Sequence, residues 1–188
     1  MTKLVTPISD QDHLQGNPQE APITLVEYGD YECPFSREAY PVVRKIQKAL
    51  GRDLVFVFRN FPLAQMHPHA LHAALAAETA GLQGKFWPMH DMLYENQDRL
   101  EDDDLLNYAA ALGLEVDRFL IDFSSEQVQL RVRRDFMGGV RSGVRSTPTF
   151  FINGKRYVGS YAYGDLLAAL RSVRLGLGQR GATAYSRA

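Results

Sequence analysis

The sequence predicts an α/β protein in which a small mixed sheet is flanked by helices and interrupted by a long helical insertion. Three observations support this class. A strand, a helix and a second strand follow one another early in the chain, a long stretch of helical patterns comes next, and a strand hairpin with a last helix closes the pattern. A strand–helix–strand unit forms a right-handed crossover between parallel strands, so the sheet is expected to be mixed.

The early unit lies between residues 23 and 58. ITLVEY (23–28) is rich in strand-forming residues, and LVFVF (54–58) is apolar at every position, as in a parallel strand covered on both faces. Between them, Pro34 suits the first position of a helix, and apolar residues recur at helical spacing until Gly51. Pro41 lies inside this helix and is expected to kink it, because it removes a backbone donor.

The remaining strands are expected near the carboxyl end. TFFI (149–152), an Asn-Gly dipeptide and KRYV (155–158) predict a hairpin, and an amphipathic helix follows. The long middle of the chain is helical throughout. The predicted division is therefore a discontinuous core over residues 1–62 and 140–178, an inserted helical subdomain over residues 63–139, and a flexible tail over residues 179–188.

Composition excludes several classes of protein. The 188 residues are 45% hydrophobic, 23% charged and carry a net charge of -1, which favours a globular protein and argues against a nucleic-acid partner. No apolar run approaches the roughly 18 residues of a membrane span, and the start of the chain has no signal-peptide pattern. A cytoplasmic protein without a membrane or nucleic-acid partner is expected, and the oligomeric state is left open.

Cys33 is the single cysteine of the chain, and it falls at or beside the start of the first helix. The positive end of a helix dipole and its free backbone N–H groups favour a thiolate, which is the form that attacks disulfides. We expect the sulfur to be exposed there and reactive. Ser36 lies one turn further on, where its hydroxyl can donate to the sulfur but cannot form a disulfide with it. The alternative is that Cys33 is a small buried hydrophobic residue.

Glu27 interrupts an otherwise apolar strand. Period-two alternation places it on the same face as Ile23 and Leu25. A carboxyl group buried on that face would have a raised pKa and could exchange protons with neighbouring groups. The alternative is an edge strand with Glu27 in solvent.

Pro148 comes immediately before a predicted strand. A trans proline there would waste a hydrogen bond of the sheet. A cis Thr147–Pro148 bond would instead make a tight turn and leave the Thr147 backbone free to pair with an extended peptide. We therefore expect a cis peptide bond at this position.

Together, Glu27 six residues before Cys33, a C-P-x-x helix start and a late Thr-Pro before a hairpin resemble the thioredoxin fold. The helical insertion narrows the resemblance to the DsbA-like thiol–disulfide oxidoreductases. Four segments in the right order are similar to the FrnE-like, or thioredoxin_4, branch of that family, and the match covers roughly residues 13–175. The segments are VEYGDYECPFSREAYPVVRKI, FVFRNFPLAQMHPHALHAALAAE, FWPMHDMLYENQ and STPTFFINGKRYVG.

The resemblance implies a role for each matching residue. Cys33 is the nucleophile, Glu27 is the buried acid, and Ser36 stands where the family usually has its resolving cysteine. The substrate-binding residues are then the variable dipeptide and the cis-proline loop, namely Pro34, Phe35, Thr147 and Pro148. The implied enzyme is a monothiol form that makes mixed disulfides with protein substrates or small thiols. It needs no cofactor, although glutathione can act as a co-substrate.

Several alternatives stay open. Ser36 fits a natural monothiol enzyme, and it equally fits a serine introduced to trap a mixed disulfide. A glutathione-dependent transferase or isomerase of the same superfamily would use Ser36 in place of Cys33. A third possibility is a non-catalytic module that binds extended peptides at Thr147 and Pro148. The physiological substrate and the direction of electron flow are not indicated by the sequence.

His67, His69 and His72 lie close together in MHPHALH. A metal site would need a third ligand in place, and Pro68 breaks the geometry between the first two histidines. A solvated helix start is favoured, and no metal is expected.

Overall fold

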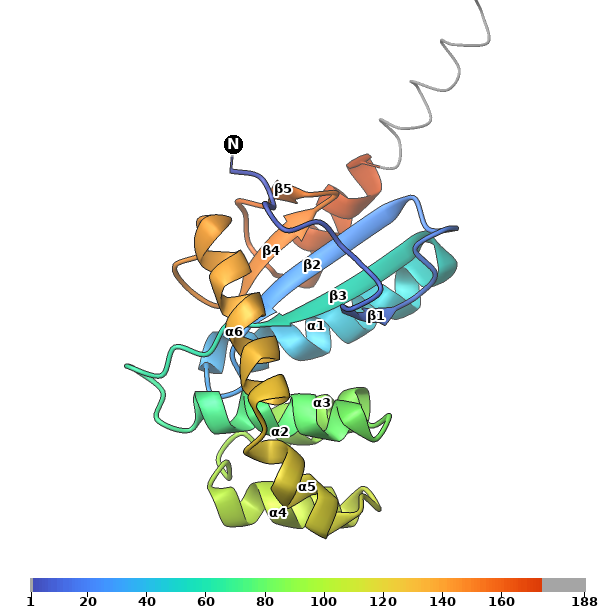
Figure 1. Ribbon diagram of the computed structural model, residues 1–188. Coiled ribbons are helices and arrows are strands. Elements are labelled where there is room, and N and C mark those ends of the chain that lie inside the picture. The colour runs from blue at the N-terminus through green and yellow to red at the C-terminus, as the bar shows by residue number, and fades with distance from the viewer. Residues whose placement is uncertain (1, 174–188) are drawn as a thin grey trace, which may run out of the picture.

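The computed structural model describes residues 2–173 and contains a five-stranded sheet in the order β1-β3-β2-β4-β5 (Figure 1). Strands β2 and β3 are parallel, and the other neighbouring strands pair antiparallel. The strands are β1 His13–Gln15, β2 Ile23–Gly29, β3 Leu54–Asn60, β4 Thr149–Ile152 and β5 Lys155–Arg156. With its flanking helices, this sheet is the thioredoxin-like α/β fold that the sequence predicts.

The helices follow the expected patterns closely. Helix α1 continues through Pro41, and Gly51 ends it with a φ of 51°, a conformation that glycine adopts at little cost. Residues 163–173 are helical up to the end of the described residues. The other bounds are α1 Pro34–Leu50, the 3-10 turn η1 Gly51–Asp53, α2 Ala70–Leu82, α3 Phe86–Glu95, α4 Asp102–Ala111, α5 Val116–Phe123 and α6 Glu126–Arg141.

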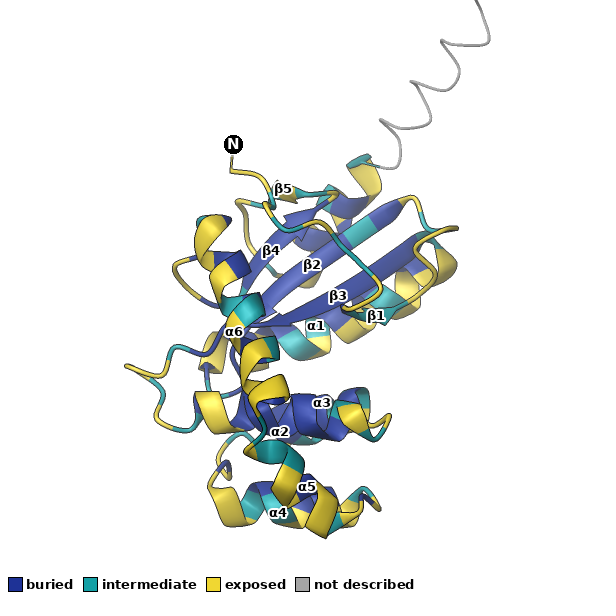
Figure 2. Ribbon diagram, in the orientation of Figure 1, coloured by how far each residue is buried: buried dark blue, intermediate teal, exposed yellow. Residues whose placement is uncertain are grey.

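The sheet is buried on both faces (Figure 2). On one face, Ile23 and Leu25 belong to the large apolar cluster that also includes residues of α1, α2 and α3. On the other face, Val26 and Tyr28 belong to a smaller cluster, which residues of the amino-terminal segment and α6 cover. Since alternate residues of a strand point to opposite faces, Glu27 lies on the same side as α1 and α3.

Helix α6 joins the inserted helices to the sheet (Figure 1). Near its carboxyl end, a Cβ at Gly139 would lie 2.6 Å from the ring of Phe61, so this close approach requires glycine. The helix continues to Arg141, which lies beyond the expected limit of the inserted subdomain at residue 139. Packing against the sheet thus makes α6 part of the core as well as of the insertion.

Two strands differ from expectation. Strand β1 was not predicted, because only three residues of a polar lead segment pair with β3. Strand β5 ends at Arg156, so KRYV does not pair along its full length. The expected flexible tail over residues 179–188 lies outside the described residues.

The amino-terminal segment is fixed to the sheet by a buried ion pair. Arg59 donates from Nε and Nη2 to the two carboxylate oxygens of Asp12, at 2.8 and 3.0 Å. Arg59 also donates to the carbonyl oxygens of Thr6 and Pro7, both at 2.9 Å, and to the Tyr28 hydroxyl at 3.0 Å. One side chain of β3 therefore contacts the lead segment at three of its residues, Thr6, Pro7 and Asp12.

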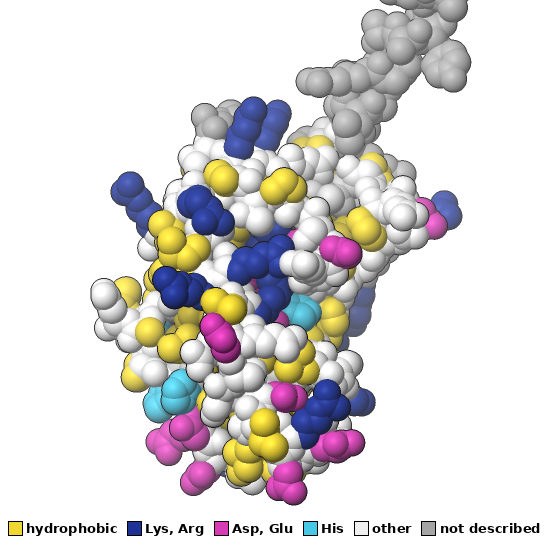
Figure 3. Space-filling model, viewed as in Figure 1, with side chains coloured by type: hydrophobic (Ala, Val, Ile, Leu, Met, Phe, Trp, Pro, Cys, Tyr) yellow, Lys and Arg dark blue, Asp and Glu magenta, His cyan; other side chains and the backbone are white. Residues whose placement is uncertain are grey.

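Acidic side chains gather at the end of the molecule formed by α4 and α5 (Figure 3). The first turn of α4 contains Asp102, Asp103 and Asp104. Carboxylates in this position interact favourably with the positive end of the helix dipole.

Candidate active site

Cys33 is the residue immediately before α1, in the loop that follows β2. Its backbone is extended, with φ -73° and ψ 121°, and Pro34 begins the helix. The Cys33 N–H donates to the Asp30 carbonyl oxygen at 3.2 Å, and the Arg37 N–H donates to the Cys33 carbonyl oxygen at 3.1 Å. These two bonds place the thiol at the amino end of a 17-residue helix.

The carboxylate of Asp30 fixes this loop and was not identified from the sequence. Asp30 is buried, and its oxygens accept from the backbone N–H groups of Glu32 and Leu63, both at 2.9 Å. His67 Nδ1 lies 2.8 Å from the same carboxylate. The Cys33 loop is thereby tied to the connection between β3 and α2. The only signal in the sequence is an aspartate placed directly after the strand, in YGDYEC.

The loop before β4 lies against Cys33. The Cys33 Sγ donates to the carbonyl oxygen of Thr147 at 3.3 Å, and the Thr147–Pro148 peptide bond is cis, the isomer expected from the sequence. Residues that are 114 positions apart in the chain thus meet at the sulfur.

The expectation that the sulfur is exposed is wrong, because Cys33 is only 3% exposed. Thr147 covers it on one side, and Gln97 Nε2 donates to the carbonyl oxygens of Tyr31 and Cys33 at 2.7 and 3.0 Å. The three apolar clusters of the described residues do not include Cys33. The Cys33 side chain is therefore buried, and its Sγ makes a polar contact with the Thr147 carbonyl oxygen.

A groove runs beside the covered thiol. It has a volume of about 370 Å³ and is lined in part by Pro148, Tyr157, Val158 and Tyr161. Val158 is 88% exposed. The pKa of Tyr161 is raised, mainly because its hydroxyl is partly buried. Its hydrogen bond to Glu38 and the nearby Cys33 raise this pKa further. Tyr161 is thus an electrostatic neighbour of the sulfur that the sequence did not reveal.

Ser36 is fully buried one turn into α1. Its hydroxyl accepts from the Asp30 N–H at 3.4 Å, and no hydrogen bond within residues 2–173 joins it to Cys33 Sγ. The expected donation to the sulfur is therefore not present, because the side chain points back toward the β2–α1 loop.

Glu27 is buried at the centre of the sheet, where it lies opposite Phe58 of β3 and Phe150 of β4. The alternative of an edge position in solvent is therefore wrong. Burial raises the pKa of Glu27 to about 8, and its Oε1 has no hydrogen-bond partner among the described residues. A carboxyl group in this setting is protonated at neutral pH.

The three clustered histidines contact three different carboxylates, His67 and His72 through their rings and His69 through its backbone N–H. His72 Nδ1 lies 2.6 Å from Asp102, whereas the N–H of His69 donates to Glu32 at 2.6 Å. His67 contacts Asp30. Within residues 2–173, His, Cys, Asp and Glu side chains do not form a group of three that could hold a metal ion.

The comparisons with known proteins identify the family. The family model Thioredoxin_4, described as thioredoxin, matches residues 9–172. The chain therefore belongs to this family, within the DsbA-like thiol–disulfide oxidoreductases.

Solved structures share the whole fold. A thioredoxin-like oxidoreductase from Silicibacter pomeroyi superposes with a TM-score of 0.79 at 25% identity, over 88% of this chain and 94% of the other. Oxidised BdbD from Bacillus subtilis superposes with a TM-score of 0.79 at 23% identity, over 92% of this chain and 97% of BdbD. The thiol–disulfide exchange protein α-DsbA2 from Wolbachia pipientis superposes with a TM-score of 0.77 at 17% identity, over 87% of this chain and 88% of α-DsbA2. The inserted helices are part of the likeness, since these matches cover nearly all the described residues.

Proteins of similar sequence are named as Na(+)/H(+) antiporters rather than as oxidoreductases. The Na(+)/H(+) antiporter NhaA 1 of Salinispora arenicola is 45% identical over 92% of this chain, and that of Mycobacterium sp. (strain KMS) is 42% identical over 91%. The chain spans only 26% and 28% of these two proteins. Among residues 2–173, the longest apolar helices fall short of what a membrane span requires.

Proposed function

We propose that this chain carries out thiol–disulfide exchange through Cys33 alone. The observation that carries the proposal is the position of the single cysteine of the chain. It lies at the amino end of α1 and 3.3 Å from the carbonyl oxygen of Thr147, beside the cis peptide bond.

The exchange has two steps. The Cys33 thiolate attacks one sulfur of a substrate disulfide, a new S–S bond forms, and the other substrate sulfur leaves as a thiolate that takes up a proton. A second thiolate then attacks the substrate sulfur of the mixed disulfide, which returns Cys33 as a thiolate. The attacking thiol belongs to the substrate itself or to a small molecule such as glutathione, because this chain has no second cysteine.

The surroundings of the sulfur support an extended polypeptide as the substrate. Phe35 is 57% exposed at the helix start, and Pro148 and Val158 line the neighbouring groove. A peptide that pairs with the Thr147 backbone would compete for the carbonyl oxygen that now accepts from the thiol. Binding of the peptide would then free the Cys33 thiol from its hydrogen bond to Thr147 in the same step.

Ser36 supports the single-thiol mechanism and not a serine-dependent transferase. Its side chain is 0% exposed, so its hydroxyl cannot contact the sulfur of a bound glutathione without movement of α1. The cytoplasm suits the proposed reaction, because its reduced thiols supply the second step.

The test is a disulfide-exchange assay with a fluorescent peptide disulfide and reduced glutathione. Cys33→Ala should abolish the rate above background, whereas Ser36→Ala should keep it. The proposal fails if Cys33→Ala retains exchange activity. It also fails if Ser36→Ala folds and loses the activity while Cys33→Ala keeps it.

A further inference from the structure

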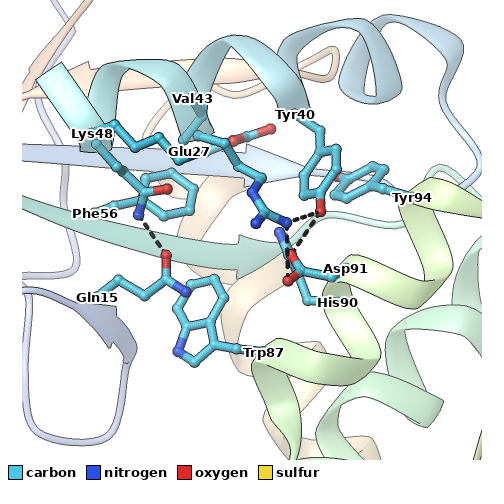
Figure 4. A pocket seen from close by; sticks show the side chains of 12 residues that line it. Gln15, Glu27, Tyr40, Val43, Lys48, Phe56, Trp87, His90, Asp91 and Tyr94 are labelled. Atoms are coloured by element: carbon cyan, nitrogen blue, oxygen red, sulfur yellow. Dashed lines mark hydrogen bonds and ion pairs between the residues drawn. The ribbon is translucent and has the colours of Figure 1, made fainter.

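A pocket separate from Cys33 opens between α1 and α3. Its volume is about 330 Å³, which falls within the range of small-molecule sites. Neither Cys33 nor Thr147 lines it. Four of the residues that line it have phenyl, phenol or indole rings (Figure 4), namely Tyr40, Phe56, Trp87 and Tyr94.

The floor of this pocket contains the buried Glu27. Its side chain is almost entirely enclosed, and Oε1 has no hydrogen-bond partner among the described residues. Because burial raises the pKa of Glu27 to about 8, the carboxyl group is protonated at neutral pH and offers one donor and one acceptor. His90 beside it is neutral, since burial lowers its pKa to about 3. An uncharged floor with an unused polar group favours a ligand that brings a hydroxyl or carbonyl group.

The pocket is lined by two cationic side chains, Arg44 and Lys48, and by the carboxylate of Asp91. Arg44 donates to the Tyr40 hydroxyl at 2.7 Å and pairs with Asp91 at 3.2 Å, so its charge is already balanced (Figure 4). Lys48, one turn further along α1, is exposed and has no charged partner within residues 2–173. On another side, Gln47 donates to Gln15 at 2.5 Å and closes the wall.

We propose that this pocket binds a small aromatic carboxylate that carries a hydroxyl or carbonyl group. The ring lies among the aromatic walls, the carboxylate lies near Lys48, and the second polar group bonds to Glu27. Aromatic pairs favour a planar ligand between Tyr40, Phe56 and Trp87. Cys33 does not line this site.

The pocket contains its own reporter, since Trp87 is the single tryptophan of the chain. We would titrate the full chain with 4-hydroxybenzoate and follow Trp87 fluorescence, with calorimetry as a second readout. Benzoate lacks the second polar group, and 4-hydroxybenzamide lacks the negative charge. The expected result is saturable binding with one site, tightest for 4-hydroxybenzoate.

Matched variants locate the ligand. Lys48→Gln should weaken binding by about three- to fivefold, the size of an exposed ion pair. Lys45→Gln, an exposed lysine on the same helix that does not line the pocket, should leave binding unchanged. Glu27→Gln keeps a donor and an acceptor and should retain binding, whereas Glu27→Leu should lose it.

Three results would overturn the proposal. They are the absence of saturable binding at millimolar 4-hydroxybenzoate, equal effects of Lys48→Gln and Lys45→Gln, or loss of binding in Cys33→Ala. If Glu27→Leu does not fold, the comparison of the two lysine variants still decides the matter.

Discussion

Cys33 Sγ and the carbonyl oxygen of Thr147 are joined by a hydrogen bond of 3.3 Å across 114 positions of the chain. The bond links the start of α1 to the loop before β4, which are the two parts of the fold that we propose a disulfide substrate contacts. It also explains why the thiol is covered in the free protein.

Ser36→Cys tests whether the missing second thiol decides the lifetime of the mixed disulfide. We expect the new thiol to release a bound substrate and to form a disulfide with Cys33, because position 36 lies one helical turn from it. Mass spectrometry would show the loss of two hydrogens in the oxidised variant. A variant that keeps both thiols free under oxidising conditions would contradict this placement.

Ser36→Ala tests the structural role of the serine. The substitution leaves the buried Asp30 N–H without the hydroxyl that accepts from it at 3.4 Å. We expect the free energy of unfolding to fall by about 1 kcal/mol, with exchange activity retained. Urea denaturation measures the first, and the peptide-disulfide assay measures the second. An unchanged stability would show that this long bond contributes nothing.

Glu27→Gln should change how stability depends on pH. The pKa of Glu27 is about 8 in the folded chain and near its ordinary value of 4.5 when unfolded, so the folded state binds the extra proton between these values. The free energy of unfolding of the wild type therefore falls as pH rises from 4.5 to 8, by about 1.4 kcal/mol per pH unit from this group. Asp135 and His90 also titrate with shifted pKa values, but both are present in the variant and cancel in the difference. The free energy of unfolding of both proteins would be measured by urea denaturation between pH 5 and pH 8. If it changed with pH in the same way for both, the raised pKa would not belong to Glu27.

Asp12→Ala should destabilise the chain strongly. The substitution leaves the buried charge of Arg59 without its carboxylate, a change that costs roughly 3–5 kcal/mol in comparable sites. The matched control is Asp98→Ala, which breaks the exposed pair with Arg37 and should cost less than about 1 kcal/mol. Similar losses for the two variants in thermal or urea unfolding would show that the lead segment is not held by Arg59.

The fold was predictable where local patterns are strong. The apolar run of β3, the proline-led start of α1 and the hairpin signal each produced the expected element. Period-two alternation also placed Glu27 on a buried face, which the structure confirms. Strand β1 was missed because three residues carry no usable periodicity.

The details of the site depend on contacts between distant segments, which sequence patterns do not encode. Helix position alone suggested an exposed sulfur, whereas Cys33 is buried, and Thr147 and Gln97 contact it from two other parts of the chain. The role of Asp30 follows from partners on a separate loop, at Leu63 and His67. Such contacts can be found only when the tertiary structure is known.

The most direct test of the central claim is to trap the mixed disulfide at Cys33. The folded chain would be incubated with excess peptide disulfide and analysed by mass spectrometry under denaturing conditions, beside the same chain unfolded in urea. We predict that the folded chain gains one peptide at Cys33, reacts faster than the unfolded chain, and releases the peptide when a thiol such as glutathione is added. A folded chain that stays unmodified while the unfolded chain reacts would contradict the account.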